Sequence, residues 1–438
     1  MLYCYKKIVS VLKSTNDGEH MQLPHIFRIR QAFNSQQVDD IATAVQNGIQ
    51  ALPLASTVKP GQTVAVACSS RGITNYGLIV KEVVSSLKAL ELNPFIFPAM
   101  GSHGSATAMG QQQVLAHLGI TKASTGAPVR SSLEVIQIGK TSHGVPVLLD
   151  KLASEADHVV LINRIKKHTE FEHEFESGLL KMMAIGIGKQ AGAARYHQAM
   201  FSYGYADAIS AIADVVMHQV PILFGVGIVE NGYGQTAQIG ICPRDQIKSQ
   251  EIGLLKLAKQ LAPSLPFREA DVLFIDEMGK EISGSGFDTK VVGRIGMPLV
   301  SPDPEYPKIK RIVVGDLTAD TEGNATGVGI ADFITQRLLD KIDRQASDMN
   351  NITGLSPEMG KIPIALASDQ EALTVAIRCL GLVSPEKLKI MRIKNTSQLS
   401  EIEVSEAYAR EFEGRSEIEI IRPKQPWDFD GEGNLPPF

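Results

Sequence analysis

The feature that most constrains the fold is an alternation of short β-branched apolar runs with helical patterns between about residues 60 and 230. This alternation is typical of βαβ units, which build a mostly parallel sheet covered by helices. The pattern predicts strands at 63–68, 94–98, 158–163 and 221–230, and helices near 76–91 and 107–118. Thr107 carries a hydroxyl of the kind favoured at a helix N-cap. The first half of the chain is therefore expected to form an α/β domain.

A second series of the same kind follows a helix expected near 251–262. It predicts strands at 271–276, 311–317 and 362–367, and helices near 328–343 and 369–381. Because a single core stops growing near about 250–300 residues, a chain of 438 residues is expected to contain more than one domain. We predict two α/β domains, each with a mostly parallel sheet flanked by helices, and an active site in the cleft between them.

The expected division of the chain has four parts. Residues 1–20 form a leader outside the fold, so that Met21 begins the folded protein. The N-terminal domain covers residues 21–265 and a smaller C-terminal domain covers 266–415. Residues 416–438 form a tail that packs back on the N-terminal domain.

Composition excludes several classes of protein. Hydrophobic residues make up 44% and charged residues 21% of the chain, with a formal net charge of -5, which argues against nucleic acid or an anionic membrane as partner. The longest apolar runs are shorter than the roughly 20 residues that span a bilayer. The four cysteines, Cys4, Cys68, Cys242 and Cys379, have no CxxC spacing, so neither a disulfide framework nor a structural zinc site is expected. A cytoplasmic protein fits these features.

Charged and imidazole side chains follow three successive predicted strands. Arg71 follows the first, His103 the second, and Lys167, His168 and His173 the third. Because the carboxyl ends of parallel strands meet at one edge of a sheet, where ligands bind, these side chains are expected to lie together. The alternative for each loop is that its residues are merely solvated.

Glycines and histidine spacing refine this expectation. Gly101 and Gly104 bracket His103 and indicate a tight turn. His168 and His173 are five residues apart, whereas the HExxH motif of zinc hydrolases needs four. The segments "GKT" (139–141) and "GIGK" (186–189) are not phosphate loops, because Glu134 and Met183 stand where the motif requires glycine.

Lys181 lies in the apolar stretch "ESGLLKMMAIGIGK" (176–189). One interpretation is that its ammonium extends to solvent along its aliphatic stem. The other is that burial disfavours the charged form and leaves a neutral amine that can form a covalent bond. His197 follows sixteen residues later and is either a surface histidine of a helix or a neutral imidazole that ligates a soft or borderline metal.

Four ordered segments resemble a known family. They are "PAMGSHGSAT" (98–107), "NRIKKHTEF" (163–171), "ESGLLKMMAIGIGK" (176–189) and "ARYHQ" (194–198). Together they resemble the nickel-pincer nucleotide-dependent lactate racemase family, and more closely its branch of uncharacterised lactate racemase-like proteins. The likeness extends from about Met21 into the C-terminal domain, where "DEMGKEISGSGFD" (276–288) fits the branch.

The resemblance implies a role for each of five positions. Lys181, preceded by Ser177 and Gly178, stands where the family's lysine forms a thioamide bond to the pyridinium pincer cofactor. His197 matches the histidine that ligates nickel. His103 matches one catalytic acid/base and His168 the other, with His173 as the competing choice for the second.

The resemblance also implies substrate contacts. Arg71 matches an arginine that binds the substrate carboxylate, and Lys280 matches a lysine of the C-terminal domain. The chain departs from the lactate enzyme at three positions. Cys68 replaces an aspartate, Gly286 a glutamine and Thr289 a lysine. Because Asp288 could accept hydrogen bonds from extra hydroxyl groups, we expect a 2-hydroxy acid larger or more polar than lactate.

The function implied is that of a racemase or epimerase of a small-molecule 2-hydroxy acid. Its cofactor would be a lysine-tethered nickel-pincer nucleotide, the nickel complex of pyridinium-3,5-bisthiocarboxylic acid mononucleotide. Removing the α-hydrogen as hydride requires an acceptor and a base for the hydroxyl proton. Two alternatives stay open, a non-catalytic ligand- or cofactor-binding protein of the same fold and a metal-free Schiff-base lysine enzyme.

Overall fold

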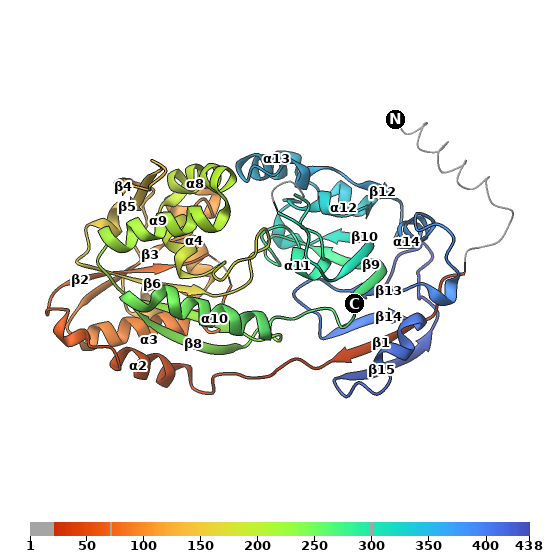
Figure 1. Ribbon diagram of the computed structural model, residues 1–438, viewed down its shortest axis with the longest axis horizontal. Helices are drawn as coiled ribbons and strands as arrows, with labels where there is room; N and C mark the ends of the chain where they lie inside the picture. Colours follow the sequence, from red (N-terminus) through yellow and green to blue (C-terminus); the bar gives the residue numbers. More distant parts are fainter. Residues whose placement is uncertain (1–21, 71, 298–300) are drawn as a thin grey trace.

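The computed structural model describes residues 22–70, 72–297 and 301–438. It contains two domains, each built on a β-sheet flanked by helices (Figure 1). The predicted fold class is therefore confirmed. The predicted leader, Met21 and Arg71 lie outside the described residues.

The sheet of the first domain has five strands in the order β3-β2-β6-β7-β8. The strands are β2 (Thr63–Cys68), β3 (Asn93–Pro98), β6 (His158–Arg164), β7 (Ile222–Glu230) and β8 (Thr236–Pro243). All four strands expected in this region are present. The first four of the sheet order are parallel, and β8 runs antiparallel to β7. Cys68 pairs with both Pro98 and Ile162, so the loops that follow β2, β3 and β6 leave from one edge, as predicted.

Helices cover both faces of this sheet. In β2, Val64 and Val66 pack toward α2 (Ile41–Gln50) and α3 (Tyr76–Ala89). The alternate residues of the same strand pack in a separate core with α8 (Lys189–Tyr203), α9 (Tyr205–Gln219) and α10 (Ile247–Leu261), because successive strand side chains point to opposite faces. The smaller elements are α4 (Ala108–His117), α5 (Lys122–Thr125), β4 (Val135–Lys140), β5 (Pro146–Asp150), α6 (Lys151–Ser154) and α7 (Leu179–Lys181).

The sheet of the second domain has eight strands in the order β12-β11-β10-β9-β13-β14-β1-β15. The strands are β1 (Ile26–Gln31), β9 (Glu269–Met278), β10 (Lys308–Leu317), β11 (Phe333–Thr335), β12 (Ile364–Leu366), β13 (Ile390–Ile393), β14 (Glu401–Ser405) and β15 (Ile418–Gln425). The helices are α11 (Thr289–Val292), α12 (Gln336–Asp340), α13 (Arg344–Thr353), α14 (Asp369–Arg378) and α15 (Ala409–Phe412). The strands from β12 to β13 are parallel, whereas β14, β1 and β15 pair antiparallel.

Both ends of the described chain belong to the second domain, which corrects two expectations. Strand β1 falls within the range assigned to the N-terminal domain, but it pairs with β14 and β15. The tail was expected on the N-terminal domain, and instead Trp427, Phe429 and Leu435 pack on the second core beside α14. Strand β1 is far apart in sequence from β14 and β15, so no local sequence pattern predicts that they pair.

The helix expected near 328–343 is also wrong. The segment forms strand β11, helix α12 and the start of α13. Thr335 ends the strand and caps α12 by accepting the N–H of Leu338 at 3.2 Å, and Asp343 caps α13 in the same way. Short apolar runs fit strand and helix equally well, and here the strand pairing of β11 with β10 decides the outcome.

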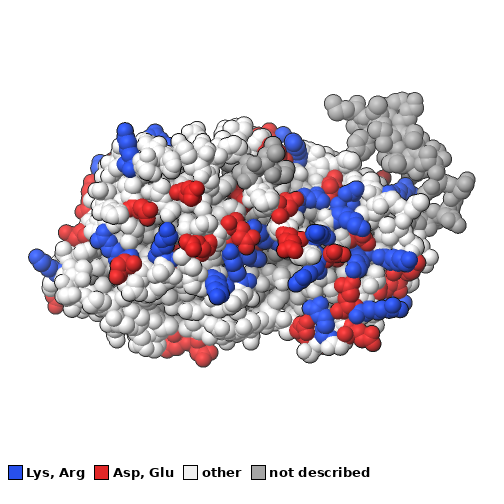
Figure 2. All heavy atoms as spheres, viewed as in Figure 1, with Lys and Arg blue, Asp and Glu red and all other residues white. Residues whose placement is uncertain are grey.

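Exposed ion pairs cross the antiparallel part of the second sheet. On the face drawn in Figure 2, acidic and basic side chains are interspersed over this domain. Arg30 lies 2.7 Å from Glu401 and 3.3 Å from Glu419 on the neighbouring strands. Opposite charges placed across strands support the pairing without adding much stability in water.

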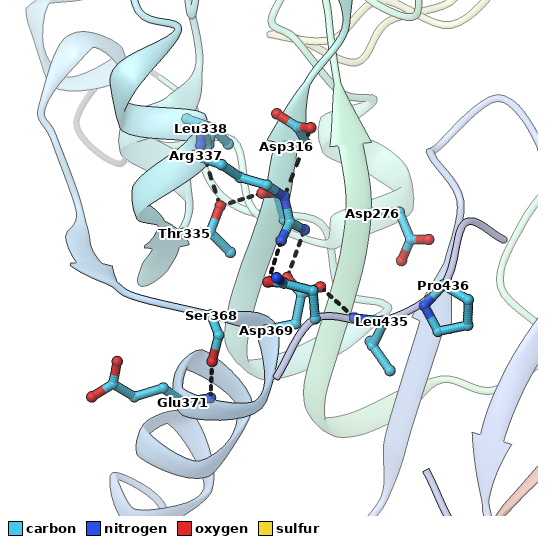
Figure 3. A network of polar contacts seen from close by, with 12 residues as sticks. Asp276, Asp316, Thr335, Arg337, Leu338, Ser368, Asp369, Glu371, Leu435 and Pro436 are labelled. Carbon is cyan, nitrogen blue, oxygen red and sulfur yellow. Dashed lines mark hydrogen bonds and ion pairs between the residues drawn. The ribbon is translucent and has the colours of Figure 1, made fainter. Parts of the chain in front are cut away.

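Hydrogen bonds and ion pairs of buried and half-buried residues hold the C-terminal segment, residues 426–438, on the second domain. Figure 3 shows Arg337 between Asp316 and Asp369, and the N–H of Leu435 on the Asp369 carboxylate at 2.9 Å. Arg337 Nη2 donates to Asp369 Oδ1 at 2.6 Å. The last residues of the chain are therefore held at the ends of the parallel strands.

A second group of charges holds the same segment. Arg392, which is buried, binds Asp276 through two contacts of 2.7 Å and Glu403 at 3.0 Å. It also donates to the carbonyl oxygen of Pro436 at 2.6 Å. Burial raises the pKa of Asp276 to about 6, although Arg392 opposes the shift. Glu403 has a second cationic partner in Arg422, so Asp276 is the acid that depends most on Arg392.

The two domains are joined by two crossings of the chain, and they also meet at the loop after β6. Residues 32–40 and 262–268 make the crossings. The loop after β6 reaches the second domain (Figure 1), where Thr289 Oγ1 donates to the carbonyl oxygen of Thr169. Lys290 Nζ lies 3.7 Å from Glu172 in the same loop. This loop carries the histidines expected at the active site.

Replacing Arg392 with methionine is expected to lower the free energy of unfolding by about 3–5 kcal/mol, because the buried carboxylate of Asp276 loses its cation while Glu403 keeps Arg422. The loss should be larger at pH 8 than at pH 5, since Asp276 is protonated at the lower pH and needs no cation. Chemical denaturation at both values measures this. Arg30→Met, which removes an exposed cation, should leave the midpoint almost unchanged. Equal losses at the two pH values would contradict the assignment.

Candidate active site

Lys181 ends the short helix α7 and is followed by a π-helical turn, Met182–Gly186. Its neighbours Leu180, Met182 and Met183 are buried in the core, whereas Lys181 itself is half-buried. Its Nζ atom lies 2.5 Å from Nε2 of His168. The lysine therefore neither enters the apolar core nor simply extends to solvent, but meets a histidine from the loop after β6.

Glycines let this segment approach the loop after β3. A Cβ on Gly186 would lie 2.6 Å from the carbonyl oxygen of Ala99, a distance that no side chain tolerates. The N–H of Gly101 donates to the carbonyl oxygen of Gly186 at 3.3 Å. The His103 turn and the Lys181 segment therefore pack directly on each other.

His168 is buried and held from three sides. Its N–H donates to Glu176 Oε2 at 2.6 Å, and its Nδ1 accepts the N–H of Glu170 at 3.1 Å. The ring lies 4.5 Å from that of Phe171, centroid to centroid. Burial above all, and then the nearby Lys181, lower the pKa of His168 well below its ordinary value. The imidazole is therefore neutral near pH 7.

His197 projects from α8 into the same region and is half-buried. Burial lowers its pKa, the charge of Glu170 opposes this shift, and that of Lys181 adds to it. Glu170 also bonds to the hydroxyl of Tyr205, whose pKa is raised by burial. We call Lys181, His168, His197, Glu170 and Tyr205 the lysine cluster.

His103 lies in the turn between β3 and α4 and is half-buried. Gly101 and Gly104 have φ of 59° and 65°, which confirms the expected tight turn. Ser105 and Ala106 are also left-handed, with φ of 53° and 51°, a strained conformation that clusters at functional sites. His103 Nδ1 bonds to the hydroxyl of Ser70, which precedes Arg71, a residue outside the described part.

Glu176 organises the loop that carries His168 and His173. Its buried carboxylate accepts the N–H of each histidine, at 2.6 and 3.3 Å, and pairs with Lys259 Nζ at 2.6 Å. The ring of His173 packs edge-on against Phe175, at 4.5 Å. Of the two candidates for the second acid/base, the geometry therefore places His168 beside Lys181.

In the second domain, Lys290 rather than Lys280 lies near the lysine cluster. Lys290 is half-buried in α11, and its charge contributes to the lowered pKa of His168. Lys280 lies in the turn after β9, where its N–H donates to Thr321 Oγ1 at 3.1 Å. The role of Lys280 stays a prediction from the resemblance. The sequence analysis did not single out Lys290, which directly follows Thr289.

Asp288 and Gly286, which precede Lys290 in the sequence, have structural roles. Asp288 Oδ1 accepts the N–H of Lys290 at 2.9 Å and caps α11. Gly286 has φ of 77°, and a Cβ there would lie 2.3 Å from Met278 Cε. The glycine therefore shapes a crowded turn and does not open a larger pocket.

Ser177 and Gly178 lie next to the segment of Lys181, and Cys68 ends a strand of the sheet. Ser177 exchanges two backbone hydrogen bonds with Lys166, at 2.9 and 3.2 Å. Gly178 directly precedes α7 and lies against Glu251 of α10. Cys68 ends β2, and burial raises its pKa to about 12, so it stays a thiol.

Lys189 is a buried cation that the sequence analysis did not single out. It is fully buried and lies 3.0 Å from Asp150, which is also fully buried. Its Nζ donates to the carbonyl oxygen of Pro98 at 2.7 Å and to Gln111 Oε1 at 2.9 Å. Gln111 in turn donates to the carbonyl oxygen of Gly101 at 2.8 Å. The pair of Lys189 and Asp150 is therefore connected through Gln111 to the turn that carries His103.

Lys189→Met is expected to cost about 3–5 kcal/mol of unfolding free energy, because it leaves the Asp150 carboxylate buried without its cation. Asp150→Leu combined with Lys189→Met should cost less than the sum of the single changes, since the two groups interact directly. Thermal and chemical denaturation measure both effects. Gln190→Met, a change of the exposed neighbour, is the control. Additive losses would refute the proposed coupling.

The part of the chain that the structure describes contains no group of three or more histidine, cysteine, aspartate or glutamate side chains arranged to hold a metal ion. No helix among the described residues is both long and apolar enough to cross a membrane. Cys68, Cys242 and Cys379 are free thiols.

Comparison with known proteins supports the resemblance seen in the sequence. Residues 19–207 match the lactate racemase N-terminal domain, a range that contains the whole lysine cluster and His103. The fold is similar to the solved structure of the lactate racemase apoprotein from Thermoanaerobacterium thermosaccharolyticum, with a TM-score of 0.54 and 15% sequence identity over 83% of this chain and 93% of that one. No curated protein sequence matches the chain. Residues 19–207 are thus similar to the lactate racemase N-terminal domain, and the fold of the chain is similar to that of the lactate racemase apoprotein.

Proposed function

We propose that the protein is a racemase or epimerase of a 2-hydroxy acid, and that Lys181 binds a nickel-pincer nucleotide covalently. The match of residues 19–207 to the lactate racemase N-terminal domain supports the reaction class. The observation that carries the proposal is the contact of 2.5 Å between Lys181 Nζ and His168 Nε2. It places an amine beside a buried neutral imidazole, next to the second histidine of the cluster.

The residues present fit a cofactor that brings most of its own metal ligands. The described residues offer no set of three metal-binding side chains, so they could not hold a metal by themselves. His197 offers one imidazole whose pKa is lowered by burial, and a neutral imidazole is the form that binds metal. His197 would hold the nickel and Lys181 the organic part, and when bound the group would supply the hydride acceptor.

The contacts of His168 support an uncharged amine at Lys181. A neutral imidazole carries a proton on only one ring nitrogen. Because Nδ1 accepts the N–H of Glu170 at 3.1 Å, the proton of His168 lies on Nε2. Nε2–H then faces Lys181 Nζ, which accepts as an uncharged amine. An uncharged amine is the nucleophile that formation of a bond to the cofactor requires.

His103 and His168 are assigned the two acid/base roles. They come from separate loops, after β3 and after β6, and so could serve opposite faces of a substrate. Burial keeps His168 neutral. To take a hydroxyl proton at Nε2, the ring would carry its own proton on Nδ1, the opposite tautomer to the one that faces the free amine of Lys181. Each histidine would remove the proton from one enantiomer and return it to the other.

We assign Lys290, together with Arg71, the role of binding the substrate carboxylate. Lys290 lies within electrostatic reach of His168, and an ammonium attracts a carboxylate as a point charge. Asp288 already uses one oxygen to cap α11, and Gly286 lies against Met278. These contacts remove the support for a larger or more polar substrate, so we propose a 2-hydroxy acid without a size preference.

Mass spectrometry of the protein produced together with the cofactor pathway tests the attachment. The expected result is a pincer adduct on the peptide that contains Lys181, absent in Lys181→Arg because a guanidinium is a poor nucleophile. An unmodified chain would favour a non-catalytic binding protein. An adduct trapped by borohydride with a keto acid, formed without cofactor, would favour a Schiff-base enzyme.

A panel of enantiopure 2-hydroxy acids, followed by chiral chromatography, tests the reaction and its bases. His168→Ala should lower the rate of inversion by about 10²–10⁴-fold, as expected for a general acid–base group. His173→Ala is the matched control from the same loop and should retain most activity, because its ring packs on Phe175. The opposite pattern would assign the role to His173.

A further inference from the structure

A buried acid lies beneath the turn that presents Lys181. Glu251 of α10 is fully buried and has no part in the chemistry proposed above. The backbone N–H of Leu180 donates to its Oε2 at 2.9 Å, and that of Leu179 also bonds to its carboxylate. Helix α7 begins at Leu179, and its N-cap residue Gly178 has no side chain that could cap it. Glu251 therefore supplies the cap from another helix.

Glu251 also accounts for Gly178. A Cβ on Gly178 would lie 2.3 Å from Glu251 Oε1 and 2.6 Å from its carboxyl carbon. The family resemblance associates this glycine with the cofactor, but the contact shows that the carboxyl group itself requires it. Only glycine lets the acid reach the first N–H groups of α7.

The same helix holds the partner of Lys181. Lys259, eight residues after Glu251 and so about two turns along α10, pairs with Glu176 at 2.6 Å. Glu176 in turn accepts the N–H of His168 at 2.6 Å. Helix α10 therefore fixes the backbone on both sides of the contact between Lys181 and His168.

Helix α10 packs closely against glycines of strands β7 and β8. A Cβ on Gly227 of β7 or on Gly240 of β8 would lie 2.7 Å from Leu254 of α10. A Cβ on Gly225 would lie 2.6 Å from Leu179 of α7. Because interiors are close-packed and transmit displacements, α7 and α10 are fixed relative to the sheet and to each other.

We propose that Glu251 is a positioning residue for the Lys181 amine. Its carboxyl oxygen caps the first turn of α7 and thereby holds Nζ against Nε2 of His168. The inference deepens the proposed function of Lys181 as the attachment point, but the contact that it explains exists without the cofactor. It can therefore be tested in the apoprotein, whether or not the cofactor is ever bound.

The role depends on an oxygen acceptor and not on the charge. Oε1 of Glu251 is buried with no hydrogen-bond partner among the described residues, so Oε2 serves both N–H groups. Burial raises the pKa of Glu251 to about 7, and the facing thiol of Cys242 stays neutral because its pKa is raised to about 12. A glutamine, with its carbonyl in the place of Oε2, should therefore preserve the cap.

The test is the rate at which acetic anhydride modifies Lys181 in the apoprotein at pH 7.5, measured by peptide mass spectrometry. Exposed Lys81 is the internal reference. Glu251→Met fills the space without an acceptor, so the first turn of α7 loses its cap and Nζ leaves His168 and gains a proton. The rate at Lys181 should then fall by about tenfold, the effect of one unit in the pKa of an amine.

Glu251→Gln should stay within about twofold of the original protein, because it keeps the acceptor. Gln260→Met, an exposed position of the same helix, should change nothing. Hydrogen exchange over residues 176–183 should accelerate in Glu251→Met alone. A Lys181 rate that is unchanged or raised in Glu251→Met overturns the proposal. If Glu251→Met does not fold, Glu251→Gln alone decides. A fall of about tenfold in the modification rate of Lys181 in Glu251→Gln would also overturn the proposal.

Discussion

The contact between Lys181 and His168 is the interaction on which the arrangement of the candidate site depends. At 2.5 Å it joins an amine and an imidazole that would repel each other if both were charged. Burial above all keeps His168 neutral, and the N–H of Glu170 directs the remaining proton of its ring toward the amine. The contact therefore requires a low-dielectric setting and a fixed tautomer, and the rest of the fold supplies both.

Apolar packing supplies the low dielectric, and buried polar groups hold the backbone segments that carry these side chains. Glu251 caps the turn of Lys181, while Lys189 and Asp150 brace the turn of His103. Groups of this kind are costly unless each is hydrogen-bonded or paired, and they confer one geometry instead of added stability. Glu251, Lys189 and Asp150 thus hold the backbone of the candidate site in place, and the proposed chemistry is assigned to other residues.

The sequence predicted the parts of this protein that are local. Strands β2, β3, β6 and β7 and the shared edge of their loops follow from alternation of apolar runs, because parallel strands at the centre of a sheet are buried on both faces. The pairing of β1 with β15 depends on contacts across the whole chain and leaves no local signal. Lys290 was missed for the related reason that α11 has only four residues, and motif spacing cannot say which neighbouring side chain points at a site.

The topology explains how the site comes to involve both domains. Because β1 and β15 both complete the second sheet, residues 32–268 form an insertion between β1 and β9. An insertion is tied at two crossings, which limits how far the first domain can move from the second. The loop of His168 meets α11 through the bond of Thr289 to Thr169 and the ion pair of Lys290 with Glu172, whose side chain is 69% exposed. Such an exposed pair contributes little energy, so the two crossings, and not the contacts at the site, keep Lys290 within reach of His168.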